Sequence, residues 1–370
     1  MKTNPYKAVD YKESAIVKAL AVAESLIADI KYDGVRLNLC VKALTDRDDG
    51  ETDVVAEYLS RVGKTIPALE HLNGFSERWA KFLADDEQPF SNGLMIDGEV
   101  MVKGVDFNTS SGLLRTVHLK EKNWKYDVNW SNSNSAPKDS NGKFIKNLPF
   151  QLDPAQLKVV VYGVVPMDVV ESGEDYDVMN VLMQMHCAVQ VALLERHFPE
   201  IEWVLPETHN VFSMEELHAL YANVRELGHE GLVVKDPFGI YRRGKKSGWW
   251  KMKPENEADG IVQGLVWGTE SLANEGKVIG FEVLLENGRV VNACNMTQGA
   301  MEDITERVLK ANMVHSYDWM ERIGTEDIQL NPYEGHQVQI KYMEETPDGS
   351  LRHPSFVCFR GTESNPEEKI

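Results

Sequence analysis

The sequence lacks any long hydrophobic run. No stretch of its 370 residues approaches the ~20 apolar residues that a membrane-spanning helix needs. The N-terminal residues 1–7 also lack the apolar core of a signal peptide. We therefore expect a protein that makes no membrane contact and works in the cytoplasm.

Cysteine is scarce, and its four copies stand far apart at Cys40, Cys187, Cys294 and Cys358. Cysteines without paired spacing indicate neither a disulfide framework nor a zinc module. We expect four reduced thiols with a structural role.

Positive net charge is missing as well, because 58 acidic residues outnumber 39 lysines and arginines and give a formal charge of −19. Such a surface does not favour nucleic acid overall, yet phosphate binding needs only a local basic face. The segment from Lys235 to Lys253 supplies one, with seven basic residues and a single acid, Asp236. Binding of a polyanion there should weaken steeply with salt.

The length and the composition favour two domains. Hydrophobic residues make up 42% of the chain, enough to bury a sizeable core, and 370 residues exceed one small domain. The composition changes after Pro254, where short strand signals replace a mixture of helices and strands. We place one domain at residues 1–254 and a second at 255–370.

Periodicity predicts the elements of the first domain. Helices are expected at 12–27, 68–83, 179–198 and 213–228, the last with a capping box from Ser213 to Glu216. Strands are expected at 35–41, 157–165 and 229–235, and residues 94–102 suggest two strand pieces around a turn at Asp97-Gly98. Residues 45–52 indicate a hairpin tip. The polar stretch 123–147 suggests a mobile surface excursion, whose lysines are either solvated or contact a polyanion.

The second domain shows alternating strand patterns at 261–266, 280–285, 289–292 and 337–343, and one helix at 301–311. Asn287-Gly288 is a strong signal for a two-residue hairpin turn. About five short strands with one helix suggest a small barrel of the oligonucleotide-binding (OB) type.

The segment Ala28 to Arg36 sets Lys31 between an apolar flank and an Asp33-Gly34 turn. A lysine there can act as a nucleophile toward phosphorus or carbonyl carbon if neighbouring groups help it lose a proton. The same pattern also fits a strand that ends in a turn beside a surface lysine.

Other stretches place charge where strands or turns end. These are Asp97-Gly98-Glu99, then Glu230 and Lys235 around an apolar trio, and Lys251 with Lys253, which a strand would put on one face. Two cations on one face are costly without an anion between them. Each stretch also has a simpler interpretation, as a solvated turn or as an edge strand protected by charge.

Five stretches of the chain resemble, in order and spacing, the five nucleotidyltransferase motifs of ATP-dependent polynucleotide ligases. They are Lys31-Tyr32-Asp33-Gly34, Asp97-Gly98-Glu99, the 157–165 strand with Tyr162, Glu230 to Lys235 and Lys251-Met252-Lys253-Pro254. The resemblance spans nearly the whole chain and is closest to the compact DNA ligases of T-seven-type tailed bacteriophages, through residues 64–72, 242–254 and 348–356. It implies an α+β fold: an adenylation (nucleotidyltransferase) domain of antiparallel sheets with flanking helices, followed by a C-terminal OB-fold β-barrel.

The resemblance also implies an activity. The family's lysine attacks the α-phosphorus of ATP, releases pyrophosphate and keeps AMP. AMP then passes to the 5′-phosphate at a nick, and the 3′-hydroxyl displaces it. For this chain we expect an ATP-dependent DNA ligase that serves phage replication, repair and recombination in the host cytoplasm, as a monomer, with ATP and nicked double-stranded DNA as partners.

The resemblance assigns roles to individual residues. The catalytic lysines are Lys31, Lys235, Lys251 and Lys253. The nucleotide is bound by Asp29, Ile30, Arg36, Glu99, Tyr162, Lys235, Lys251, Lys253 and Arg352, where family members often have Glu at the position of Asp29. Glu99 and Glu230 hold Mg²⁺ or Mn²⁺, for which carboxylate oxygens are suitable ligands. Six basic residues face DNA: Arg61, Lys64, Arg242, Arg243, Lys245 and Lys246.

The last motif departs from the family. Arg352 to Phe356 with Arg360 resembles it, but the basic ending of larger ligases is missing, because Gly361-Thr362-Glu363 follows. Arg360 fits a paired arginine on a buried strand as well as a pyrophosphate contact. A hinge near 254–260 would let the small domain close.

Four rival interpretations stay open. An RNA ligase and a GTP-using capping enzyme share the lysine motif, and a non-catalytic DNA-binding protein could retain the fold. An NAD-dependent ligase fits less well, because the clustered cysteines of its zinc module are absent. Gly239 to Ser247 approaches a phosphate-binding P-loop, but Lys246 stands where Ser or Thr is required, and Gly248-Trp249-Trp250 leads into a strand.

Overall fold

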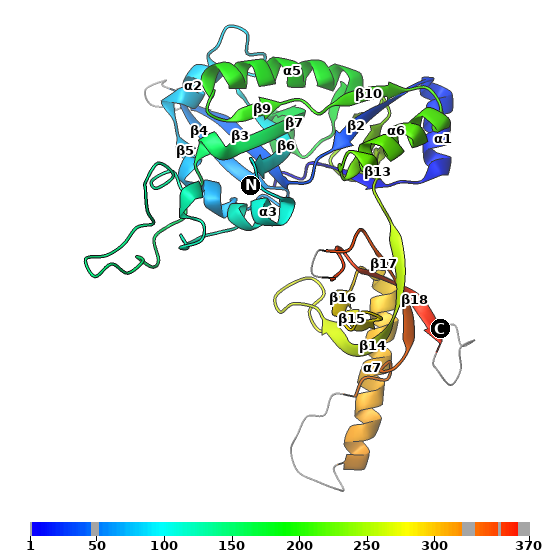
Figure 1. The fold of residues 1–370 in the computed structure, drawn as a ribbon. Coiled ribbons are helices and arrows are strands. Elements are labelled where there is room, and N and C mark those ends of the chain that lie inside the picture. The colour runs from blue at the N-terminus through cyan, green and yellow to red at the C-terminus, as the bar shows by residue number, and fades with distance from the viewer. Residues whose placement is uncertain (1, 46–51, 320–329, 347–348, 362–370) are drawn as a thin grey trace. The chain divides into compact units, whose positions relative to one another are not determined.

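The structure is a computed structural model that describes residues 2–45, 52–319, 330–346 and 349–361 (Figure 1). The chain divides into two compact units, unit 1 from Met1 to Met252 and unit 2 from Lys253 to Ile370. Two hydrophobic clusters fill unit 1 and a third fills unit 2. The two units therefore fold around separate interiors.

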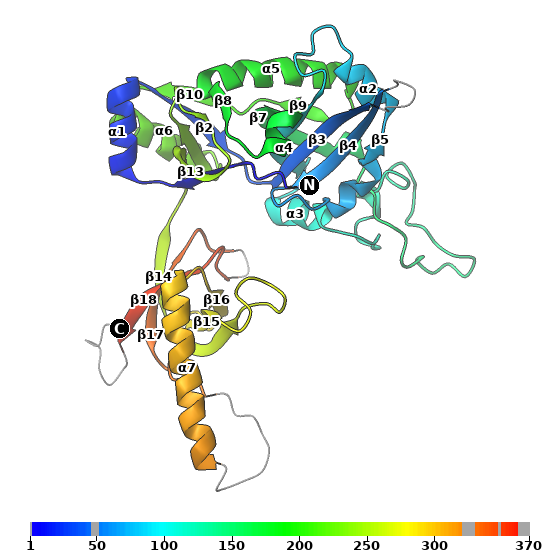
Figure 2. The same ribbon diagram turned by 180° about the vertical axis from the view of Figure 1, so that it is seen from behind.

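The larger sheet of unit 1 has six strands in the order β5-β4-β3-β6-β7-β9. Its strands are β3 (Val35–Thr45), β4 (Thr52–Ser60), β5 (Gly74–Phe75), β6 (Gly93–Val102), β7 (Leu157–Pro166) and β9 (Glu202–Val204). The helices beside it are α2 (Glu77–Leu83), α3 (Phe107–Leu114), α4 (Met167–Ser172) and α5 (Asn180–His197). Helix α5 runs along β7 and β9, as both ribbon views show (Figure 2).

The second sheet of unit 1 has five strands in the order β1-β13-β11-β2-β10. Its strands are β1 (Tyr6–Asp10), β2 (Leu26–Lys31), β10 (Thr208–Val211), β11 (Gly231–Lys235) and β13 (Gly244–Met252). Helices α1 (Glu13–Ala23) and α6 (Met214–Glu226) cover one face of it, where Ile16 and Leu217 are fully buried. The other face is left for polar side chains.

Smaller elements complete unit 1. Strands β8 (Tyr176–Met179) and β12 (Ile240–Tyr241) form a two-stranded ribbon, and three 3₁₀ helices occur at η1 (Pro67–Leu72), η2 (Trp124–Tyr126) and η3 (Pro154–Gln156). The Ser213 hydroxyl accepts from the amide of Glu216, as the predicted N-cap requires, and α6 is followed by Gly228 at φ +86°.

Unit 2 is a five-stranded sheet in the order β16-β15-β14-β17-β18 with one helix in its described part. The elements are β14 (Asn256–Trp267), β15 (Val278–Leu285), β16 (Val290–Ala293), α7 (Gln298–Trp319), β17 (Gln337–Tyr342) and β18 (Ser355–Gly361). A single bridge between Cys294 and Ser355 links the two edge strands, which otherwise leave the sheet open. The predicted α+β class is confirmed, because both units combine β-sheets with helices.

Two predicted helices are shorter than expected. The helix predicted over 12–27 ends at Ala23, because Glu24 turns to φ 62° and Leu26 already pairs with Val211 in the sheet. The helix predicted over 68–83 is broken into η1 and α2 by an extended Asn73 and by Gly74 at φ +116°.

Residues 94–102 form one continuous strand, β6, so the predicted turn at Asp97-Gly98 is wrong. A Cβ atom on Gly98 would lie 2.5 Å from the carbonyl oxygen of Val160, so glycine here lets β7 approach closely. The register shifts at this point: Asp97 faces Gly163 and Gly98 faces Val161, which leaves Tyr162 as the extra residue of a bulge.

The remaining loop predictions have mixed outcomes. Strands β3 and β4 pair as far as Thr45 and Thr52, while the predicted hairpin tip at 46–51 lies outside the described residues. The stretch 123–147 contains η2, the fully buried Asp127 and an isolated bridge between Lys138 and Phe144. In the described part of the chain, no helix is long and apolar enough to span a membrane.

Candidate active site

The polar face of the second sheet gathers the charged residues around Lys31. Side chains alternate along a strand, so Ala28 and Ile30 of β2 point into the core under α1 and α6. Asp29 and Lys31 point to the opposite face, beside Val233 and Gly231 of β11. The side chain of Ile30 therefore cannot meet a nucleotide on the polar face, where only its main chain is available.

Asp29 and Lys235 form a buried ion pair in this face. The Lys235 ammonium lies 2.6 Å from Asp29 Oδ2, and the two side chains are only 7% and 6% exposed. The Thr208 hydroxyl donates to Asp29 Oδ1 at 2.6 Å, and the ring centre of Trp249 lies 4.1 Å from the Lys235 ammonium. Thr208 and Trp249 therefore hold the ion pair in place. Loss of either charged partner would be strongly destabilising, because the other charge would stay buried and unpaired.

Lys31 donates a hydrogen bond to Glu230, the residue that precedes β11. Glu230 is 7% exposed and Lys31 is 25% exposed, so the amine remains accessible beside a buried carboxylate. Gly34, three residues after Lys31, lies against Glu99 of β6, and the charges of Lys31 and Glu230 act on that carboxyl in opposite directions. The two sheets of unit 1 thereby bring one lysine and two carboxylates together.

Gly34 explains how the turn after Lys31 reaches β6. A Cβ atom on Gly34 would lie 2.7 Å from Glu99 Cγ and 2.8 Å from the carbonyl oxygen of Val100. No real side chain tolerates such contacts with backbone, so the turn requires glycine. The Asp-Gly motif therefore positions Glu99 as well as forming a turn.

Replacing Gly34 with alanine should destabilise the protein by roughly 1–3 kcal/mol, because the added methyl overpacks this contact. Thermal unfolding measures the effect. The matched control is Gly112→Ala in helix α3, where an added Cβ meets nothing within 4 Å and alanine is the better helix former. Equal melting temperatures for the Gly34 variant and the wild-type protein would contradict the close approach.

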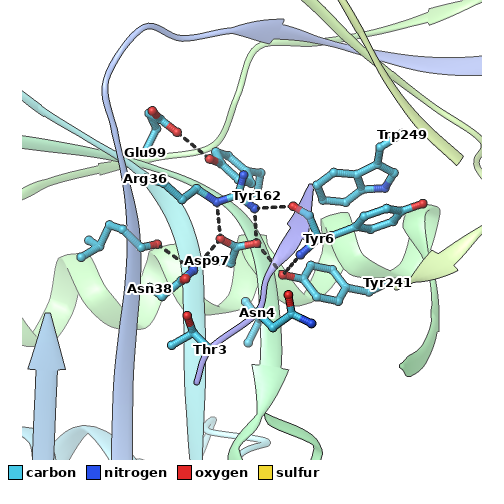
Figure 3. Close-up of polar contacts among 12 residues, drawn as sticks. Thr3, Asn4, Tyr6, Arg36, Asn38, Asp97, Glu99, Tyr162, Tyr241 and Trp249 are labelled. Atoms are coloured by element: carbon cyan, nitrogen blue, oxygen red, sulfur yellow. Dashed lines mark hydrogen bonds and ion pairs between the residues drawn. The ribbon is translucent and has the colours of Figure 1, made fainter. Parts of the chain in front are cut away.

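A network around Asp97 holds Arg36 (Figure 3). Arg36 donates to both carboxylate oxygens of Asp97 at 2.6 Å and to the Tyr6 carbonyl at 2.9 Å. Asn38 and the Tyr241 hydroxyl donate to the same carboxylate at 2.8 and 2.5 Å. Asp97 is fully buried, and its charge is satisfied by four donors.

Tyr162 connects this network to Glu99. Its hydroxyl donates to Glu99 Oε2 at 2.7 Å, and the Arg36 guanidinium lies 4.7 Å from its ring centre. Burial raises the pKa of Glu99 above its ordinary value, although Lys31, Arg36 and the Tyr162 hydroxyl oppose this. Burial also raises the pKa of Tyr162 and Tyr241 well above the ordinary value, so both hydroxyls remain donors.

The last two motif lysines are placed differently from each other. Lys251 of β13 lies opposite Val233 on the polar face, 3.0 Å from Asp10 Oδ1. Strand β13 ends at Met252, so Lys253 lies one residue beyond it, and the common face of the two lysines stays a prediction. In unit 2, Arg352 pairs with Glu344 at 2.8 Å and Arg360 with Asp259 at 3.2 Å.

The predicted DNA-contacting residues fall into two groups. Arg61, Lys64, Arg242, Lys245 and Lys246 are exposed or half-buried at the ends of β4 and the start of β13. Arg243 is instead 5% exposed, and its guanidinium donates to the carbonyls of Thr3, Asn4 and Val169. We therefore remove Arg243 from the DNA-facing set, because its donors are used inside unit 1.

The sequence interpretation missed several residues of the site. Tyr6, Thr208 and Trp249 each contact a predicted site residue, and Tyr241 donates to Asp97, which was noted only as part of a motif. The contacts of Thr208 and Tyr241 join segments more than a hundred positions apart. Only Trp249 gave a local signal, because it lies in the same short stretch as Lys251 and Lys253.

For metal binding, no group of three or more His, Cys, Asp or Glu residues with suitable spacing occurs among the described residues. Glu99 and Glu230 are two carboxylates beside Lys31. Mg²⁺ typically uses one or two protein carboxylates and takes its other ligands from water and substrate phosphates. The donor set therefore fits Mg²⁺ bound together with a polyphosphate.

Comparison with known proteins covers the whole chain. Residues 5–253 match the model of the ATP dependent DNA ligase domain, and residues 254–360 match that of the DNA ligase C-terminal domain. The chain is 55% identical to the DNA ligase of Escherichia phage T7 and 53% identical to that of Enterobacteria phage T3, over 100% of this chain and 99% of each relative. A solved structure of the bacteriophage T7 ATP-dependent DNA ligase in complex with ATP superposes with a TM-score of 0.61 at 54% identity, covering 97% of this chain and 99% of that one.

Proposed function

The chain belongs to the family of ATP-dependent DNA ligases, and we propose that Lys31 is the residue through which it seals nicks in duplex DNA. One observation carries this assignment. Lys31 is a partly exposed amine that donates to the buried carboxylate of Glu230, and the turn that follows it lies against Glu99 of the other sheet. A nucleophilic lysine needs such a setting of charged groups around an electrophilic phosphorus.

In the first step, Lys31 Nζ attacks the α-phosphorus of ATP. A nitrogen–phosphorus bond forms, the bond to the pyrophosphate oxygen breaks, and the neutral amine loses one proton while its nitrogen keeps the other. Attack requires the neutral amine, and Glu230, which accepts a hydrogen bond from Nζ, is placed to orient it and to accept a proton. Lys235 and Lys251 share the polar face with Lys31 and supply positive charge for the phosphates.

Asp29 is proposed to read the adenine base. Its carboxylate holds Lys235 and accepts from Thr208, which fixes its orientation on the polar face. Arg36 is proposed to contact the nucleotide or the nick phosphate, and Tyr162 to lie near the base. Asp97 and the Tyr6 carbonyl would position Arg36 for that contact.

Glu99 and Glu230 would hold the Mg²⁺ on which this family depends. When bound, the metal supplies a positive charge that neutralises phosphate oxygens. Glu99 is fixed for this task by the Tyr162 hydroxyl and by the close approach of Gly34. Glu230 is fixed by Lys31.

Glu99→Gln should raise the Mg²⁺ concentration needed for half-maximal adenylation by about 10–100-fold, the usual cost of disturbing a metal site. Burial raises the pKa of Glu99, so its ionised form costs more in the folded protein than in the unfolded chain. In the wild-type protein, stability falls as pH rises from the unfolded pKa of Glu99 through its raised folded pKa. Glutamine carries no charge, so the variant should be as stable as the wild-type protein at pH 7 or more stable. The measurements are a Mg²⁺ titration of AMP transfer and thermal unfolding. A lower melting temperature with an unchanged Mg²⁺ requirement would contradict this role.

The later steps act on DNA. AMP passes from Lys31 to the 5′-phosphate at the nick, where a phosphoanhydride bond forms and the nitrogen–phosphorus bond breaks. The 3′-hydroxyl then attacks that phosphate and releases AMP. We propose that Arg61, Lys64, Arg242, Lys245 and Lys246 contact the DNA backbone during these steps.

The two units take separate parts in this proposal. Residues 1–254 form the adenylation domain and residues 255–370 the OB-fold domain, which brings Arg352 to the pyrophosphate. A hinge at 254–260 would allow this movement, although β14 already begins at Asn256. Small-angle scattering tests the hinge, because free and nick-bound protein should differ in their profiles.

The experiment that tests the proposed function compares substrates. The protein should become labelled by α-labelled ATP and not by GTP, and it should seal nicked DNA much faster than nicked RNA. We further propose that it acts as a monomer in the host cytoplasm. Labelling by GTP alone would contradict the proposal.

A further inference from the structure

An exposed cationic excursion leaves unit 1 between α3 and β7. Residues 115–147 contain seven basic residues against three acidic ones, in a chain whose formal charge is −19. All seven are exposed: Arg115, Lys120, Lys122, Lys125, Lys138, Lys143 and Lys146. In both ribbon views the excursion projects away from the sheets of unit 1 (Figures 1 and 2).

These seven cations have no acidic partner among the described residues. No ion pair within 4.0 Å involves any of them in the part of the chain that the structure describes, and only Lys125 has a ring contact, with Trp124. Three lysines elsewhere in unit 1 are paired instead: Lys42 with Glu171, and Lys103 and Lys158 with Glu202. Residues 115–147 therefore hold seven exposed cations that have no ion pair among the described residues of an acidic protein.

The excursion is built on an internal scaffold. The fully buried carboxylate of Asp127 accepts from the amides of Asn129 and Gln151 at 2.9 and 2.8 Å. At its tip, Asp139 accepts from the amide of Lys143, opposite the bridge between Lys138 and Phe144. The lysines are therefore presented on a folded turn and not on a featureless tail.

The base of the excursion continues into the surface proposed to contact DNA. The amide of Leu152, where the chain returns, donates to the carbonyl of Ala68 at the start of η1. Only a short connection separates Ala68 from the turn that exposes Arg61 and Lys64. That turn ends β4, whose last residue, Ser60, pairs with Leu37 beside Arg36 of the site.

We propose that residues 115–147 bind the sugar-phosphate backbone of duplex DNA on the flank of the nick. The proposal rests on the function proposed above, which supplies the polyanion. An unpaired row of lysines on a fixed turn matches a regular array of phosphates, and it contributes affinity without reading sequence. The excursion would lengthen the contact that begins at Arg61 and Lys64.

The test variant is the triple substitution Lys138→Gln, Lys143→Gln and Lys146→Gln at the tip. The matched control is Lys42→Gln, Lys103→Gln and Lys158→Gln, which removes the same charge from paired lysines elsewhere in unit 1. Binding is followed by fluorescence anisotropy without divalent metal, at several salt concentrations. The two nicked duplexes carry about 6 or about 20 base pairs on each side, so that only the longer offers flanking phosphates.

Wild-type protein and the control variant should each bind the longer duplex more tightly than the shorter one. The tip variant should bind both duplexes with similar affinity, and it should bind the longer one at least about tenfold more weakly than wild-type protein at 0.15 M salt. The slope of the logarithm of its binding constant against the logarithm of salt concentration should be smaller by about 1 for each lost phosphate contact. Wild-type affinity and slope in the tip variant would overturn the inference, as would an equal loss in the control.

Labelling with α-labelled ATP separates this result from the proposed function. The tip variant should take up AMP as the wild-type protein does, because its substitutions lie outside the nucleotide site. If wild-type protein takes up no AMP, the proposed function itself fails, and this inference fails with it.

Discussion

Lys31→Ala should abolish the transfer of AMP from ATP to the protein and lower the rate of nick sealing by at least about 10⁴-fold. The reason is that the remaining lysines of the polar face cannot replace a covalent nucleophile. Alanine removes an amine that is 25% exposed and leaves Glu230 with one partner fewer. Incubation with α-labelled ATP followed by denaturing electrophoresis measures the transfer, and a nicked duplex measures sealing.

The control for Lys31→Ala is a nick that already carries AMP on its 5′-phosphate. The last step needs no lysyl-AMP, so the variant should seal this substrate within about tenfold of the wild-type rate, the range expected when only positioning is lost. Failure on this substrate would indicate a folding defect or a different role for Lys31. Normal sealing of an ordinary nick by the variant would refute the assignment.

Asp97→Ala should destabilise unit 1 by about 3–5 kcal/mol, because it leaves a partly buried guanidinium without its counter-charge. Arg36 is 20% exposed and Asp97 is not exposed, so solvent screens the pair little. Asn38 and Tyr241 lose their acceptor as well. Urea unfolding measures the change in the free energy of unfolding, and the Michaelis constant for ATP should rise because Arg36 is no longer held.

Tyr241→Phe is the matched control for Asp97→Ala. It removes one donor from the same carboxylate and the acceptor of the Tyr6 amide, and it should cost less, about 1–2 kcal/mol. A similar cost for both substitutions would contradict the view that Asp97 is the charged centre of the network.

The sequence predicted the parts of this site that lie within one segment. Glu230 and Lys235 around their apolar trio were recognised from one segment, and the structure places them just before β11 and at its end. Strand β2 was not predicted, and Ile30, which was assigned to the nucleotide, points its side chain into the core. The Asn287-Gly288 turn and the Ser213 cap were predicted for similar reasons, because each depends on neighbours a few residues away.

Long-range contacts could not be predicted in this way. The bond from Tyr241 to Asp97 spans 144 positions, and that from Tyr6 to Tyr241 spans 235. Arg243 appears in the sequence as one more residue of a basic loop, yet its burial depends on carbonyls of the N-terminal segment. Gly98 was mistaken for a turn residue, because the close approach of β7 that requires it has no local signature.

The most direct test of the central claim is to locate the AMP on the protein. Wild-type protein is incubated with ATP and Mg²⁺, digested under alkaline conditions that preserve a phosphoramidate, and its peptides are analysed by mass spectrometry. The account predicts a single AMP adduct, on Lys31, that disappears when nicked DNA is added. An adduct on Lys235, Lys251 or any other residue in place of Lys31 would contradict it.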